Sequence, residues 1–175
     1  MRNYKTEGIV LKRTNIGESD RILTVFTQKF GKIQIKAPGV RKINSKRSAH
    51  IEPLNITLLN LYKSARSQIP IVTEAQNINS FSAIKNDLKK IGFAYYICEL
   101  IYNFCAENQE NQRVYNLTKS TFINLENSKN GSSVVDNFEK KFAKLSVSQS
   151  AKNNLENFVL KLNSNIREYI FRRSK

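Results

Sequence analysis

The chain has 175 residues, 40% of them hydrophobic, so it can bury the core of one large domain or two small ones and is not a disordered tail. Its 29 Lys and Arg against 14 acidic residues give a formal charge of +15. That excess favours a polyanionic partner, although a generally basic protein from an AT-rich genome would show it too. No apolar run approaches the ~20 residues of a membrane span, and no secretory signal is visible. Two cysteines without such a signal indicate the reducing cytoplasm.

The first 80 residues have the pattern of short β-strands. Residues 32–37 alternate, with Ile33, Ile35 and Ala37 on one face and lysine or glutamine on the other. Further strands are expected at about residues 8–13, 21–27, 54–62 and 71–76, separated by turn residues. Five short strands with no helical segment between them predict a small antiparallel barrel. Five is the strand count of an OB-fold, and an SH3-like barrel fits the pattern nearly as well.

From about residue 82 the apolar residues recur with the period of an α-helix. Residues 84–105 carry two apolar rows, which predicts one long helix buried among several neighbours. Shorter helices are expected around residues 115–125, from an N-cap at Ser133 to Leu145, and over 155–169. The fold class is therefore α+β: a five-stranded barrel domain over residues 1–80, followed by an all-helical domain over residues 81–175.

Positive charge is concentrated in the barrel half. Residues 1–80 hold 14 basic and 5 acidic residues, and the stretch from Lys36 to His50 contains no acid at all. A basic loop between two barrel strands can follow a phosphate backbone without reading bases. Phe30 and Tyr62 could stack on bases, whereas Phe26 is expected in the core. The predicted nucleic-acid-binding residues are Arg13, Arg21, Lys36, Arg41, Lys42, Lys46 and Arg47.

Residue types needed for catalysis or metal binding are scarce. His50 is the only histidine, and its place beside the basic loop favours a polar surface role or a phosphate contact over general-base chemistry. Cys98 and Cys105 are seven residues apart on one predicted helix face, roughly 10 Å along its axis, too far for a disulfide or a shared zinc ion. The glycines are isolated and form no phosphate loop. We therefore expect no enzyme, no cofactor, no bound metal and no small-molecule substrate.

Several segments resemble the RecO recombination-mediator family. They are Glu7–Lys12, Gly17–Thr24, Phe26–Ile33, Ala37–Arg41, Ile51–Leu54, Tyr62–Lys63, Glu74–Gln76 with Ser80–Phe81, and Ala94–Leu100. The resemblance covers roughly residues 5–125. It implies an OB-fold followed by a helical domain, with DNA contacts in Ala37–Arg41 and the basic loop after it.

The same resemblance implies a function. It implies binding and annealing of single-stranded DNA, with double-stranded DNA as an open alternative, and help in loading recombinase onto strands coated with single-strand-binding protein. The implied partners are RecR and the acidic tail of that coating protein, and the implied location is the cytoplasm at the nucleoid. Many family members hold zinc in a four-cysteine module of the helical domain, and this chain lacks those cysteines, as if the segment near Asn127–Ser133 were deleted.

Two other hypotheses stay open. The helical domain could make the protein an adaptor that binds an acidic partner tail, with DNA contact secondary. The barrel could also bind RNA, because stacking and phosphate contacts alone do not distinguish the two nucleic acids.

Overall fold

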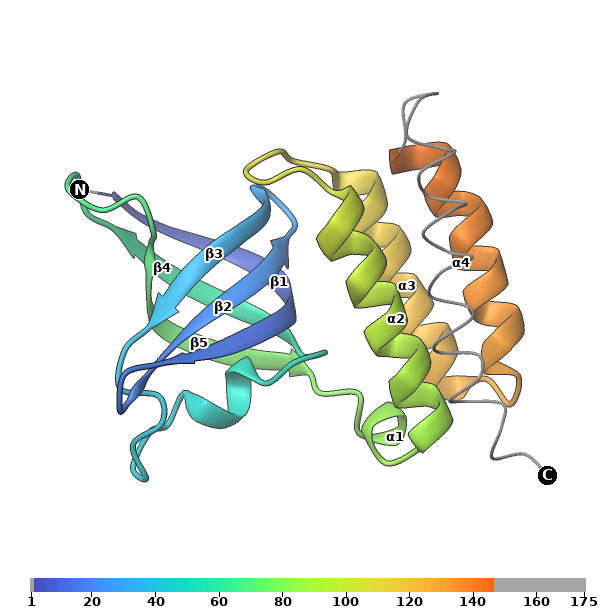
Figure 1. Ribbon diagram of the computed structural model, residues 1–175, viewed down its shortest axis with the longest axis horizontal. Helices are drawn as coiled ribbons and strands as arrows, with labels where there is room; N and C mark the ends of the chain where they lie inside the picture. Colours follow the sequence, from blue (N-terminus) through green and yellow to red (C-terminus); the bar gives the residue numbers. More distant parts are fainter. Residues whose placement is uncertain (1, 147–175) are drawn as a thin grey trace. The chain divides into compact units, whose positions relative to one another are not determined.

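The computed structural model describes residues 2–146 of the chain (Figure 1). The strands are β1 (Arg2–Ile16), β2 (Asp20–Thr27), β3 (Gly31–Ala37), β4 (Ile56–Lys63) and β5 (Ile71–Asn79). A 3-10 helix, η1 (Ser48–Ile51), lies between β3 and β4. The α-helices are α1 (Ser82–Lys85), α2 (Leu88–Phe104), α3 (Gln112–Asn127) and α4 (Gly131–Ser146). The helix expected over residues 155–169 lies outside the described residues.

The five strands close into a barrel in the order β1-β2-β3-β5-β4, with β4 returning to β1. Every neighbouring pair is antiparallel except β3 and β5, which are parallel. This strand order is that of the OB-fold, which confirms that prediction and decides against the SH3-like alternative. The four helices that follow confirm the expected α+β class.

Strand β1 is much longer than its sequence pattern suggested. Its first half pairs with β4 and its second half with β2, so one strand serves two neighbours around the barrel. The register slips by one residue between Val10 and Lys12, as a β-bulge does. Such a bulge bends a strand strongly, which lets β1 follow the curve of the barrel wall.

The barrel interior is filled by alternate residues of each strand. Ile33, Ile35 and Ala37 of β3 point inward as predicted. The other core members come from the remaining strands, the loop after β3 and η1: Val10, Leu23, Val25, Val40, Ile51, Leu59, Leu61 and Val72. Burying each aliphatic side chain of this size contributes about 1.5–3 kcal/mol, so this interior is the main source of barrel stability.

By its internal contacts the chain forms two compact units. Of the described residues, the first comprises residues 2–81 together with Cys105–Asn116, and the second comprises Ser82–Phe104 with residues 117–146. We call Cys105–Asn116 the return segment, because it belongs to the barrel unit although 23 residues of the other unit precede it. The proposed boundary between domains at residues 80 and 81 stays a prediction.

Both ends of the return segment are bonded to strands of the barrel. Near its start, Glu107 forms a parallel bridge with Lys32, and the Asn108 N–H donates to the Lys32 carbonyl at 2.9 Å. Near its end, the Tyr115 hydroxyl donates to the Glu7 carboxylate at 2.8 Å. The Tyr115 ring lies 6.0 Å from that of Phe26. Phe26 is thus fully buried as expected, but on the outer face of β2.

In the helical unit, the predicted long helix is interrupted. Asp87 accepts hydrogen bonds from the backbone N–H groups of Lys89 and Lys90, at 2.9 and 3.0 Å, and so caps a new helix, α2. Helix α4 begins at Gly131, and the cap is Asn130, whose side chain accepts from the Ser133 N–H, so the prediction of Ser133 as the cap was wrong. Val135, Phe138 and Phe142 of α4 are buried as expected, whereas Leu145, which the same spacing also predicts to point inward, is 37% exposed. None of the helices in residues 2–146 is long and apolar enough to cross a membrane.

Candidate nucleic-acid interface

The loop between β3 and η1, residues 38–47, carries four cations (Arg41, Lys42, Lys46 and Arg47) and no acid. It leaves the barrel where β2 and β3 pair through Arg21 and Ala37, beside the short turn that joins β1 to β2. Its conformation therefore depends on the hydrogen-bonding groups of that turn. We call residues 38–47 the basic loop.

Asp20 joins the β1–β2 turn to the start of the basic loop. Its carboxylate accepts the Gly39 N–H at 2.9 Å and the Ser19 hydroxyl at 3.3 Å, and it pairs with the Lys36 ammonium at 3.1 Å. The Gly39 N–H, followed by Lys36, holds the pKa of the Asp20 carboxyl below its ordinary value. Asp20 therefore stays ionised and keeps the loop docked over a wide pH range.

Arg41 continues the same docking. Its backbone N–H donates to the Ser19 carbonyl at 3.0 Å, and its guanidinium donates to the Gly17 carbonyl at 2.8 Å. The side chain is nevertheless exposed. A guanidinium has five donors, so most remain available for a phosphate oxygen.

Arg47 ties the far end of the basic loop to the barrel. Its two terminal nitrogens donate to the Val72 carbonyl at 2.5 Å and the Pro38 carbonyl at 2.7 Å. One guanidinium thus connects β5 with the beginning of the loop. Hydrogen bonds from a charged group contribute about 1.5–3 kcal/mol. Arg47, predicted as a DNA contact, therefore also helps to hold the loop in place.

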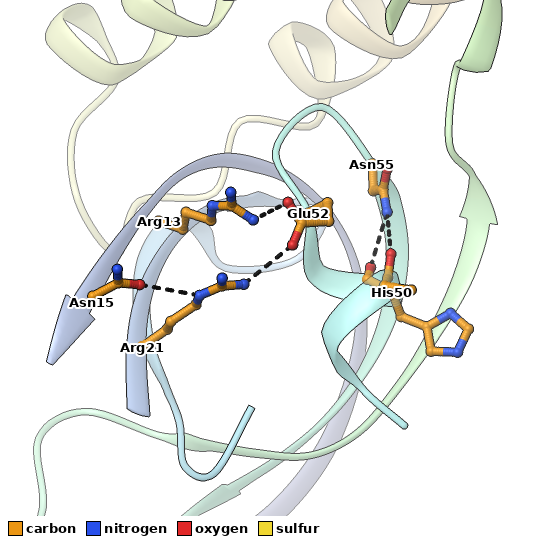
Figure 2. A network of polar contacts seen from close by, with 7 residues as sticks. Arg13, Asn15, Arg21, His50, Glu52 and Asn55 are labelled. Carbon is orange, nitrogen blue, oxygen red and sulfur yellow. Dashed lines mark hydrogen bonds and ion pairs between the residues drawn. The ribbon is translucent and has the colours of Figure 1, made fainter. Parts of the chain in front are cut away.

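Arg13 and Arg21 share one carboxylate, that of Glu52 (Figure 2). Arg21 binds one oxygen of Glu52 at 3.2 Å and also donates to the Asn15 side chain at 3.2 Å, whereas Arg13 contacts the other oxygen. The trio therefore carries a net charge of +1. Arg21 is the less accessible of the two arginines, with 14% of its side chain exposed.

Lys42 and Lys46 differ from the other five predicted residues. Both side chains are exposed, and within residues 2–146 neither forms a side-chain hydrogen bond or an ion pair. Ile43 between them is fully exposed as well. The structure thus places Arg41 and Arg47 on the docked loop, Lys42 and Lys46 at its exposed part, and Lys36 beside it near the end of β3.

The three residues considered for catalysis or metal binding are hydrogen-bonded or buried. The Nδ1 atom of His50 accepts the Asn77 N–H at 3.3 Å, and its carbonyl accepts the Asn55 side-chain amide at 3.4 Å (Figure 2). Cys98 and Cys105 are both buried free thiols. Burial raises the pKa of Cys98 well above its ordinary range and that of Cys105 to about 11. Neither thiol is a thiolate nucleophile near neutral pH.

Sequence reasoning missed a second group of cations. Pairing of β1 with β4 places Arg2 opposite Lys63, and Arg66 follows in the β4–β5 loop. These residues are 61 positions or more from Arg2 along the chain, so only the strand register brings them together. The only sequence signal that could have pointed to this group is local, because Phe30 and Tyr62 each lie beside a lysine.

Comparisons with known proteins agree with this architecture. Residues 1–81 match the family model described as "Recombination protein O N terminal", and residues 85–146 match "Recombination protein O C terminal". The chain belongs to the RecO family. Proteins named "DNA repair protein RecO" from Dehalococcoides mccartyi, Roseiflexus and Alkaliphilus metalliredigens are 38%, 35% and 35% identical to it.

These alignments cover only part of each relative. They span 71%, 69% and 67% of this chain but 49%, 41% and 47% of the respective relatives. The chain thus spans about half the length of the curated RecO proteins it matches. The matched part includes the OB barrel and the basic loop.

Proposed function

We propose that this RecO-family chain is a non-catalytic mediator of DNA repair that binds single-stranded DNA with the basic loop of its OB barrel. It would anneal strands and help to load recombinase onto strands coated with single-strand-binding protein. The observation that carries the proposal is the docked, acid-free loop, on which Lys42 and Lys46 are exposed and Arg41 keeps donors available. A loop held in place loses less entropy when it binds a strand.

The proposed partners follow from the family. They are RecR and the acidic tail of the single-strand-binding protein, met in the cytoplasm at the nucleoid. The high positive charge of the chain suits both DNA and an acidic peptide tail. Double-stranded DNA is a further proposed ligand, because phosphate contacts do not require a single strand.

The experiment is a titration of the full chain against a fluorescently labelled single-stranded oligonucleotide, followed by anisotropy at several salt concentrations. The test variant combines Arg41→Gln, Lys42→Gln and Lys46→Gln, and leaves Arg47 and Asp20 to hold the loop. Each phosphate contact on a single strand contributes about −0.7 to the slope of log K against log salt, so losing three should flatten it by about 2.

A matched control removes the same charge elsewhere. Lys129, Lys140 and Lys144 are exposed residues of the helical unit, and their triple change to Gln lowers the net charge equally. We expect the control to bind nearly as the parent does. Equal weakening in both variants, or an unchanged slope in the loop variant, would contradict the loop assignment. Stronger binding of an RNA oligonucleotide would favour the RNA hypothesis.

The adaptor hypothesis rests on a different surface. Leu88, Tyr95 and Tyr102, seven residues apart on α2, are 70%, 46% and 36% exposed. An exposed apolar row on a helix can bind a partner segment. Weak DNA binding at low salt, together with binding of a labelled acidic peptide that Leu88→Gln reduces, would favour this alternative.

A further inference from the structure

The barrel is closed between β3 and β5 by very little pairing. One parallel pair, Lys36 with Ile71, joins the two strands, and the Lys36 N–H donates to the Pro70 carbonyl at 2.9 Å. The start of β3 is covered separately, where the Lys32 carbonyl accepts the Asn108 N–H at 2.9 Å. Between these two points the edge of β3 lies open.

Gln34 is the residue at that opening. Backbone groups of alternate residues in a strand point to the same edge. Since Lys32 and Lys36 both bond away from β2, the N–H and C=O of Gln34 face that outer edge too, and no described backbone group bonds them there. A free donor beside a free acceptor is the pairing pattern of a nucleobase edge or of another strand.

A cavity of about 450 Å³ lies at this opening, and two aromatic rings form part of its wall. The rings of Tyr4 and Phe30 meet edge to face, with centroids 4.8 Å apart, and both pack on the barrel core. Burial raises the pKa of Tyr4, so its hydroxyl remains a neutral donor. The volume lies within the ~300–1,000 Å³ usual for sites that bind small groups.

The charges at the rim are mixed. Arg2 and Lys63 supply two cations, and the Arg2 guanidinium lies 5.9 Å from the centre of the Tyr4 ring. Glu107 supplies one carboxylate, and Asn108 an amide. Cations suit a phosphate, a carboxylate accepts from a base amino group, and aromatic rings suit a base face. A nucleotide presents all three of these features together.

We propose that this cleft between β3 and the β4–β5 loop takes one unstacked nucleobase of a bound single strand, with the adjoining phosphate on Arg2 and Lys63. The inference rests on the proposed DNA binding and adds a second contact to it. From Gln34 to the start of the basic loop is four strand residues, or roughly 13 Å. One strand could cover both surfaces, since an OB-fold occupies about 4–16 nucleotides.

The test is photocrosslinking of the full chain to short single-stranded oligonucleotides that carry 5-iododeoxyuridine at successive positions. This base crosslinks on irradiation to aromatic side chains that it touches, and mass spectrometry identifies the peptide. We expect crosslinks at Tyr4 or Phe30. Anisotropy on the same oligonucleotides measures binding independently of crosslinking. If the chain binds none of them, the proposed function is refuted. If it binds them but crosslinks only at other residues, the cleft alone is refuted.

Affinity provides a second readout. The double variant Tyr4→Leu, Phe30→Leu keeps apolar volume at the barrel end but removes the rings, and we expect it to bind a single strand at least about 5-fold more weakly. Tyr102→Leu is the matched control, because it removes an exposed ring of the helical unit. If the double variant does not fold, Arg2→Gln with Lys63→Gln leaves the core intact and should also weaken binding. Unchanged affinity in a folded cleft variant would overturn the proposal.

Discussion

Replacing Gly31 with alanine should separate the return segment from the strands of the barrel. Gly31 has φ of +65°, and a Cβ built there would lie 1.9 Å from the Gln109 carbonyl oxygen. Backbone cannot yield as a flexible side chain can, so either β3 or the return segment has to move. Gly17 offers the matched comparison: its φ is +55°, yet a Cβ there would meet nothing within 4 Å.

The two substitutions share one cost and differ in another. A left-handed alanine costs about 1–2 kcal/mol at either position. At Gly31 the return segment also shifts, which endangers the burial of Tyr115, worth about 1.5–3 kcal/mol, and its hydrogen bond to Glu7, worth about the same. We therefore expect Gly31→Ala to lower the free energy of unfolding by about 3–6 kcal/mol more than Gly17→Ala does.

Urea unfolding followed by far-UV circular dichroism measures this difference, because the chain has no tryptophan to report on fluorescence. Limited proteolysis of each variant adds a local measurement, with new cleavage expected within residues 105–116 of Gly31→Ala only. Equal destabilisation of the two variants, with the return segment still resistant to cleavage, would refute the reasoning that this segment is fastened at Gly31.

Two further predictions concern pH. The pKa of Asp20 is lowered in the folded protein, so its contribution to stability is complete above the ordinary value of 3.8 and is lost as the pH falls below it. The urea midpoint should therefore fall less between pH 5 and pH 3 in Asp20→Asn than in the parent, and parallel curves would contradict this role. Burial, followed by the bond to Glu7, raises the pKa of Tyr115 far above 10.0, so stability should decline as the pH rises above 10. Tyr115→Phe should cost about 1–3 kcal/mol at pH 7 and remove part of that alkaline decline, and an unchanged alkaline slope would show that Tyr115 ionises in the folded state.

Local patterns in the sequence predicted the barrel strands well. Strand β3 shows a clean alternation, and its inward residues are the ones expected. The alternation failed at one place, because Lys32 is 7% exposed although it lies on the outer face with Gln34. The return segment covers it there. Its partner residues lie more than 70 positions away, and no periodicity within one strand reports such a contact.

The charge of the basic loop was also visible in the sequence, but the partners of its cations were not. Glu52 reaches Arg13 and Arg21 because η1 and the following turn carry it back beside β1 and β2. Arg47 finds backbone carbonyls, which have no sequence signature. In the helical unit, the apolar rows extend across Asn86 and Asp87, so the pattern predicts one continuous helix where the Asp87 cap separates α1 from α2.

The barrel unit is built from two separate stretches of the chain, and this affects how it forms during synthesis. The Tyr115–Glu7 bond joins residues 108 positions apart. A ribosome that adds about 5–20 residues per second needs roughly 2–7 s to proceed from Phe81 to Asn116, and the whole of α2 is made in that interval. During it the nascent strands carry Phe26 without the ring that later covers it. Contacts so distant along the chain form slowly. Chaperone binding or a pause in translation would therefore affect folding of the barrel unit most strongly during this interval.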